Sequence, residues 1–276
     1  MILAGNRGRV LNIRDDGKDI PIETRIIANL RSVSVNPTNN SALLVGNAGT
    51  LIAIKNGIAT RLASSTFENL RVVRWNADGS QALIAGNNGT LIKYTEQGIE
   101  AIEGARANLR GISWRRTFHE ALVTSNCFAE AFVPSPNLFL FDAGKNTLMP
   151  VSEGRLDLIG VDWKPDGSFA LVVGYDVVWH TGFIGRFEAP NLSAIAFQNA
   201  QVYPTAVSWD PTGTMAAIAT CITQLRSGEG KIMLWNGDTL QEIYRNEHFF
   251  FSAVAWSPVG FKLAALASTA ARTFDS

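Results

Sequence analysis

The sequence predicts an all-β fold assembled from repeated units, and three observations support this prediction. First, residues 70–94 contain three strand-length apolar runs separated by the turn segments NADG and GNNG. Asp-Gly and Asn-Gly pairs accept positive φ at small cost, so both segments predict hairpin turns between antiparallel strands. Second, runs such as ALIA lack polar alternation, which indicates a sheet covered on both faces. Third, weaker copies of this unit recur along almost the whole chain, and such copies must pack against one another.

The copies align on the last apolar residue of the first predicted strand, which is Trp in five of the six copies: Val35, Trp75, Trp114, Trp163, Trp209 and Trp256. The position recurs at intervals of 39 to 49 residues. This interval agrees with the roughly 40 to 45 residues of a four-stranded propeller blade. The turn after the aligned position repeats as well, reading NADG, KPDG, DPTG and SPVG. The sequence therefore predicts a β-propeller.

At these residues the chain resembles the WD40 family of β-propellers. The resemblance is carried by AVSWDPTGTMAAIAT, AVAWSPVGFKLAALAS and GKIMLWNGDTLQEI, where Trp235 and Asn236 stand at the family's Trp-Asp dipeptide. The family's Gly-His pair is missing from every copy, and the dipeptide position is filled elsewhere by Ala53-Ile54, Lys93-Tyr94 and Leu140-Phe141. The resemblance thus implies the propeller architecture, and it does not extend to the family's buried Asp-His hydrogen-bond network.

Each end of the chain supplies part of a repeat. Residues 2–8 (ILAGNRG) match LLVGNAG of the next copy, so the N-terminal piece holds a second, third and fourth strand. Residues 251–268 hold a first and a second strand. We expect the two ends to share one closing blade, which removes exposed sheet edges. With five complete repeats between them, this gives six four-stranded blades in a single domain over residues 1–276. Seven blades are the alternative, and the duplicated second strand is unexplained.

Composition narrows the class of protein and its partners. Apolar residues make up 46% of the chain and charged residues 17%, with 24 basic and 24 acidic side chains and a net charge of zero. No global field attracts nucleic acid or an anionic membrane, so we expect neither as a partner. No apolar run is long enough for a membrane span. Cys127 and Cys221 lie in repeats that are not neighbours, too far apart for a disulfide. We therefore expect a soluble, cytoplasmic, monomeric protein with free thiols.

One class of turn breaks the repeat. The turn from second to third strand is GNAGT or GNNGT in the first copies, but the next three copies have longer and more apolar inserts, reading CFAEAFVPSP, YDVVWHT and CITQLRSGEG. All these turns emerge on one face of a propeller, and loops on a rigid scaffold carry recognition. The candidate partner-binding residues are Phe128, Phe132, Tyr175, Trp179, His180 and Arg226. The alternative is that the inserts fold over one another as a small satellite core.

A second candidate is a polar ring on the innermost strands, one residue before each aligned position: Ser34, Arg74, Ser113, Asp162, Ser208 and Ala255. Arg74 and Asp162 are its only charges and can meet only through the central channel. Because a buried unpaired charge is costly, they should be hydrated, paired with loops, or part of a small-ligand site.

The chain carries little else that indicates chemistry. Its three histidines lack metal-site spacing, and no nucleophile elbow or phosphate loop is present, so we expect neither a metal, a cofactor nor a catalytic site. The sequence therefore favours a non-enzymatic protein–protein interaction scaffold, with its partner on the insert-bearing face of the third to fifth complete repeats. The alternatives are a propeller that binds a small ligand or carbohydrate, and a hydrolase with its site at the channel mouth.

Overall fold

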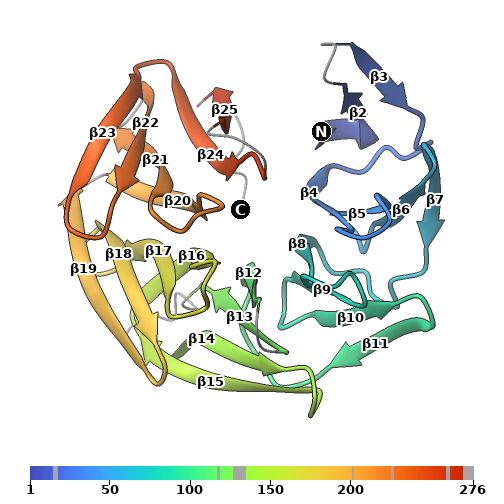
Figure 1. The fold of residues 1–276 in the computed structure, drawn as a ribbon, viewed down its shortest axis with the longest axis horizontal. Coiled ribbons are helices and arrows are strands. Elements are labelled where there is room, and N and C mark those ends of the chain that lie inside the picture. Colours follow the sequence, from blue (N-terminus) through green and yellow to red (C-terminus); the bar gives the residue numbers. More distant parts are fainter. Residues whose placement is uncertain are drawn as a thin grey trace.

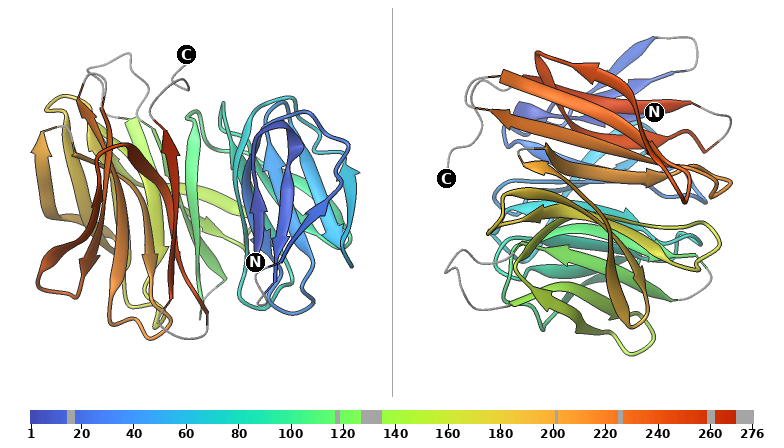
Figure 2. Two further views of the ribbon diagram at one scale, coloured as in Figure 1. Left: turned by 90° about the horizontal axis from the view of Figure 1, so that it is seen from above. Right: turned by 90° about the vertical axis from the view of Figure 1, so that its left-hand side faces the viewer.

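The computed structural model describes residues 1–14, 18–116, 119–126, 135–200, 202–224, 227–258 and 262–269. In this part of the chain the strands form seven antiparallel sheets, arranged as a ring around a central axis (Figure 1). The strands run from one face of the ring to the other, so their ends and turns gather on two faces (Figure 2). Among the described residues there is no helix whose length and apolar character would let it span a bilayer.

Five sheets have four strands each, and each is a simple meander in sequence order. The first two are β4 (Leu30–Val35), β5 (Ala42–Gly46), β6 (Leu51–Lys55) and β7 (Ile58–Leu62), then β8 (Leu70–Trp75), β9 (Ala82–Gly86), β10 (Leu91–Thr95) and β11 (Gly98–Ile102). The third is β12 (Leu109–Arg115), β13 (Glu120–Ser125), β14 (Ser135–Asp142) and β15 (Thr147–Gly154). The fourth and fifth are β16 (Leu156–Trp163), β17 (Ala170–Asp176), β18 (Thr181–Glu188) and β19 (Asn191–Ala200), then β20 (Val202–Trp209), β21 (Ala216–Gln224), β22 (Ser227–Trp235) and β23 (Leu240–Asn246).

The two chain ends form smaller sheets. The N-terminal sheet contains β1 (Ile2–Ala4), β2 (Val10–Ile13) and β3 (Asp19–Ile22), with the 3-10 turn η1 (Asn6–Gly8) between β1 and β2. The C-terminal sheet contains β24 (Phe249–Trp256) and β25 (Leu263–Thr269). The all-β fold and the repeat boundaries predicted from the sequence are thereby confirmed.

The aligned tryptophans form the core between neighbouring sheets, as the repeat register predicts. Four of the five pack edge-on against an aromatic ring of the third strand in their own sheet, for example Trp75 on Tyr94, with centroids 5.6 Å apart, and Trp114 on Phe141, at 6.0 Å. The strand register pairs Ala82 with Tyr94 and Ala216 with Trp235. The predicted Trp-Asp alignment is therefore wrong by one residue in the weaker copies. The residues equivalent to Trp235 are Ile54, Tyr94 and Phe141, the second residue of each predicted pair.

The predicted sharing of one blade by the two ends is not confirmed. β1 pairs with β2 and β25 pairs with β24, in two separate sheets, and among the described residues no sheet joins them. Each innermost strand from β4 to β24 packs against the next, but no comparable packing joins β24 back to β4 in that part of the chain. This explains the duplicated second strand, because β1 and β25 hold the same place in two different sheets.

Candidate functional site

The innermost strands of six sheets surround a central channel. A cavity of about 600 Å³ is lined by residues of β4, β8, β12, β16, β20 and β24. Among the described residues, none from the N-terminal sheet lines it. Among the described lining residues the ionisable side chains are Arg74, Arg116 and Asp162. With one carboxylate and no histidine, they offer no pair of groups for general acid and base catalysis.

Most of the predicted polar ring is structural. The Oγ of Ser34 accepts a hydrogen bond from the backbone N of Trp75 in the next sheet, at 3.1 Å. Ser113 accepts in the same way from Trp163, at 3.0 Å, and Ser208 from Trp256, at 3.4 Å. Each side chain thus satisfies a backbone donor of the neighbouring innermost strand, which would otherwise have no partner. The ring residues link consecutive sheets sideways.

Asp162 belongs to the same set of links and carries a charge. Its Oδ2 accepts from the backbone N of Trp209 at 2.8 Å, and its Oδ1 accepts from Ser113 Oγ at 3.0 Å. Burial raises the pKa of Asp162 to about 6, against the lowering effect of these hydrogen bonds and of Arg74. The hydrogen bonds therefore hold the carboxylate in a fixed position between neighbouring sheets, and withdrawing its charge from water lowers the stability of the fold.

Arg74 departs from this pattern because its side chain is exposed within the channel. Its Nη1 donates to the carbonyl O of Val73 at 2.9 Å and to Ser32 Oγ at 3.4 Å. No ion pair joins it to Asp162 in the described structure. Of the expected possibilities, the geometry favours a hydrated guanidinium at the channel wall.

The insert of the fourth repeat is an extended hairpin. β17 and β18 continue their pairing to Asp176 opposite Thr181, so only residues 177–180 form the turn. Asp176 Oδ1 accepts from the backbone N of Val178 at 2.8 Å and from that of Trp179 at 2.9 Å. The turn is therefore fixed by a side-chain cap. At its tip Trp179 is 75% exposed and His180, with φ of 52°, is exposed as well.

Tyr175 lies at the base of this hairpin, directly before Asp176. Its hydroxyl donates to Asp157 Oδ2 at 2.5 Å, and its ring lies edge-on to Tyr203 of the next sheet, with centroids 5.2 Å apart. Burial and the hydrogen bond to Asp157 raise the pKa of the Tyr175 hydroxyl. Tyr175 thus braces two neighbouring sheets and is only half-exposed, unlike Trp179.

The remaining predicted insert residues, Phe128, Phe132 and Arg226, lie outside the described residues, as does Cys127. The insert of the fifth repeat is again largely strand, since β21 and β22 stay paired to Gln224 opposite Ser227. Cys221 is a buried free thiol, and burial raises its pKa to about 11. Among the described residues no group of three potential metal ligands was found.

Comparisons with known proteins support the fold. No protein-family model and no curated protein matches the sequence. Among solved structures, the chain is similar to the β-propeller domain of Cps50 (Swd1) from Myceliophteria thermophila, with a TM-score of 0.69 and 13% identity. The match covers 96% of this chain and 89% of that domain. It confirms the predicted resemblance to WD40-like β-propellers at the level of the fold.

Proposed function

We propose that this β-propeller is a non-enzymatic scaffold that docks a protein partner on the face where the extended hairpins emerge. The observation that carries this proposal is Trp179, which is 75% exposed at the tip of a capped turn. The other six tryptophans of the chain are buried or half-buried in the sheets: Trp75, Trp114, Trp163, Trp209, Trp235 and Trp256.

An exposed Trp on a fixed turn has the properties of a binding anchor. Trp buries a large apolar area with few rotatable bonds, and it is enriched among the residues that dominate interface energetics. Because the Asp176 cap already orders the turn, little conformational entropy remains to be lost when a partner binds. The 75% exposure of Trp179 argues against the satellite-core alternative for this residue, since a core residue would be covered.

The channel is the basis of the second candidate function, a small-ligand site. Its volume of about 600 Å³ and the exposed Arg74 guanidinium would suit a small anionic molecule. The ring residues count against it, because their polar atoms are engaged in links between sheets. The hydrolase and carbohydrate alternatives have no supporting contact in the described structure.

We also propose a blade count for the ring. Of the two expected blade counts, we favour seven ring positions, because β1 and β25 are both second strands and each already has its own sheet. In this arrangement the described residues hold no innermost strand for the N-terminal sheet and no outer two strands for the C-terminal sheet. A single domain, a monomeric state and a cytoplasmic location without nucleic-acid partners remain predictions from the sequence.

The experiment compares affinity captures from native lysate by the wild-type protein and by Trp179→Ala. The matched control is Ile58→Ala, which removes a 70% exposed apolar side chain from the β6–β7 turn on the opposite face. We expect partners that depend on Trp179 and not on Ile58, with both variants melting like the wild type. Identical partner lists for all three proteins would reject docking through this hairpin.

A further inference from the structure

The innermost strands of three neighbouring complete sheets carry an arginine at the same structural position. Arg31, Arg71 and Arg110 each follow the first residue of their strand, at a β-bulge where the pairing register shifts. A bulge turns its extra residue away from the regular ladder. The three bulges lie at the strand ends beside the turns from second to third strand, so the arginines are on the face proposed for docking.

Two of these side chains are held in place by the adjoining turn. Arg31 Nε donates to Asn47 Oδ1 at 2.9 Å, and Arg71 Nε donates to Asn87 Oδ1 at 3.0 Å. The bond occupies Nε and leaves the two Nη groups of each guanidinium free to bind. The equivalent Asn126 of the third repeat has a buried Oδ1 without a hydrogen-bond partner among the described residues.

The turns that hold the arginines are themselves fixed to the connectors that lead into the next sheet. Asn69 Oδ1 accepts from the backbone N of Ala48 at 2.9 Å, and Asn108 Oδ1 accepts from that of Asn88 at 3.0 Å. Gly49 has φ of 63°, and a Cβ at this position would lie 1.9 Å from the carbonyl O of Thr66. The backbone of these turns is therefore held by hydrogen bonds and close packing before any partner binds.

The three arginines are not neutralised. Among the described residues none of them forms an ion pair with a carboxylate. Glu68, the acid in the adjoining connector, accepts a hydrogen bond from Asn88 Nδ2 at 2.8 Å. Burial lowers the pKa of Arg71, and the charges of Arg110 and Arg31 lower it further. Like charges are thus held close together at a cost, which a bound anion would relieve.

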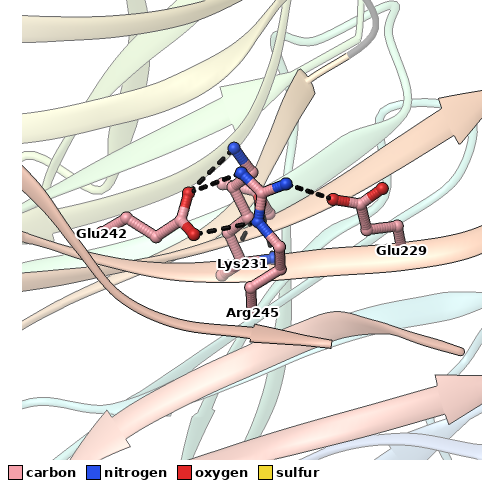
Figure 3. A network of polar contacts seen from close by, with 5 residues as sticks. Glu229, Lys231, Glu242 and Arg245 are labelled. Carbon is pink, nitrogen blue, oxygen red and sulfur yellow. Dashed lines mark hydrogen bonds and ion pairs between the residues drawn. The ribbon is translucent and has the colours of Figure 1, made fainter. Parts of the chain in front are cut away.

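A cluster of ion pairs on the outer surface of the fifth sheet provides a comparison, because its arginine is paired with carboxylates. Arg245 Nε lies 2.9 Å from Glu242 Oε1 and its Nη1 lies 3.2 Å from Glu229 Oε1, while Lys231 Nζ lies 2.9 Å from Glu242 Oε2 (Figure 3). These bonds lower the pKa of Glu242 to about 2. Both cations of this cluster have acidic partners, whereas Arg31, Arg71 and Arg110 have none in the described structure, so their guanidinium groups are available to a bound anion.

Large apolar side chains are exposed in the connectors that lead into two of the arginine-bearing strands, four residues before Arg31 and Arg71. Phe67, in the connector before β8, is 95% exposed, and Ile27, in the equivalent connector before β4, is 91% exposed. Neither contributes to the core. Unpaired cations beside exposed apolar groups suit a peptide with both acidic and apolar side chains better than they suit a free inorganic anion.

We propose that Arg31, Arg71 and Arg110, with Phe67 and Ile27, form a binding surface for an acidic linear segment of a protein partner. We call this surface the arginine face. Its guanidinium groups bind carboxylates of the segment, and Phe67 and Ile27 contact an apolar side chain beside them. This rests on the proposed scaffold function and gives the chemistry of its partner, although it uses the first three complete sheets and not the Trp179 hairpin.

The test is a fluorescence-anisotropy titration of the full chain with a short labelled peptide rich in Asp and Glu and containing one Leu. We expect saturable binding that weakens at least about tenfold in the double variant Arg31→Gln plus Arg71→Gln. Phe67→Ala should weaken it severalfold. The variant Arg61→Gln removes an exposed arginine from β7 and should bind like the wild type. Arg31→Lys plus Arg71→Lys keeps the charge and should retain intermediate affinity.

Several outcomes would overturn the proposal. Equal affinity of the wild type and the Gln double variant would show that the arginines do not bind the peptide. An equal loss in Arg61→Gln would show a non-specific charge effect, and binding confined to a phosphoserine version of the peptide would replace the acidic segment with a phosphorylated one. Failure here while Trp179-dependent partners persist would reject the arginine face alone. Peptide binding without Trp179-dependent partners would reject the hairpin instead.

Discussion

Replacing Asp162 with Asn should remove a specific pH dependence of stability. The pKa of Asp162 is about 6 in the folded protein, above the 3.8 of an unperturbed Asp, because the half-buried side chain is partly withdrawn from water at the channel wall. The folded protein therefore holds a proton more tightly than the unfolded chain, and its stability falls as pH rises from about 4 through 6. Above that range the full cost of the buried charge remains. The shift corresponds to about 3 kcal/mol at most, and water in the channel reduces it to about 1 to 3 kcal/mol.

The Asn side chain has nearly the same shape, and its amide O can still accept from Trp209 N. We therefore expect the free energy of unfolding of Asp162→Asn to decrease less between pH 4 and pH 7.5 than that of the wild type, by about 1 to 3 kcal/mol. The measurement is urea denaturation at several pH values with a fluorescence readout. A pH dependence identical to that of the wild type would refute the assignment of the shift to Asp162.

Asp210 is the matched control, because it is a buried carboxylate with the opposite shift. Burial alone would raise its pKa, but hydrogen bonds from Thr212, from the backbone N of Met215 and from Thr214 hold that pKa below its usual value. Its stabilisation is complete above pH 4 and is lost only as pH falls further. Asp210→Asn should therefore lose about 1 to 2 kcal/mol evenly across the tested range, with no change in pH dependence.

Three further predictions concern packing and use the same denaturation assay. Trp209→Ala should cost about 3 to 5 kcal/mol, because the ring is buried against Phe169 and Trp235, and a loss below about 1 kcal/mol would contradict the repeat register. Gly89→Ala should lower the free energy of unfolding by about 1 to 3 kcal/mol more than Gly57→Ala. Both glycines have positive φ, but only at Gly89 would a Cβ meet a backbone carbonyl, the O of Ala105 at 2.0 Å; equal losses would show that this turn can move. Leu44→Ala should cost about 2 to 5 kcal/mol and Leu3→Ala under about 1 kcal/mol, because the equivalent Leu3 of β1 is 37% exposed; equal costs would mean that β1 is covered in solution.

Much of the fold could be predicted from the sequence because every repeat carries its own local signals. Turn pairs such as Asp78-Gly79 and the recurring Trp fix strand ends and the core position, and these depend on neighbours in sequence. Closure could not be predicted in the same way. Whether β1 and β25 share a sheet depends on contacts between opposite ends of the chain, and both have the same second-strand pattern.

The candidate site was predicted only in part, for a related reason. Apolar inserts drew attention to Trp179, and its exposure is as expected of an anchor. The lengths of the inserts, however, could not distinguish a loop from strands that continue past the sheet, as β17 and β18 do. The arginine face was missed, although its signal is in the sequence: Leu-Arg begins the first strand in three repeats, and an Asn follows each Arg after 16 residues.

The matched bulge positions also divide the docking face into two chemically different halves. Arg31, Arg71 and Arg110 occupy the bulge in the first three complete sheets, whereas Ile159 and Thr205 occupy it in the other two and Ser252 in the C-terminal sheet. Because the register shift occurs at this position in all six innermost strands, the side chain is the variable that sets local charge. A partner lying across the channel mouth would therefore contact cations on one side and the Trp179 hairpin on the other. If one partner uses both halves, the losses of binding free energy from Trp179→Ala and from the arginine double variant should add, because Arg31 and Arg71 lie in the first two complete sheets and Trp179 lies in the fourth.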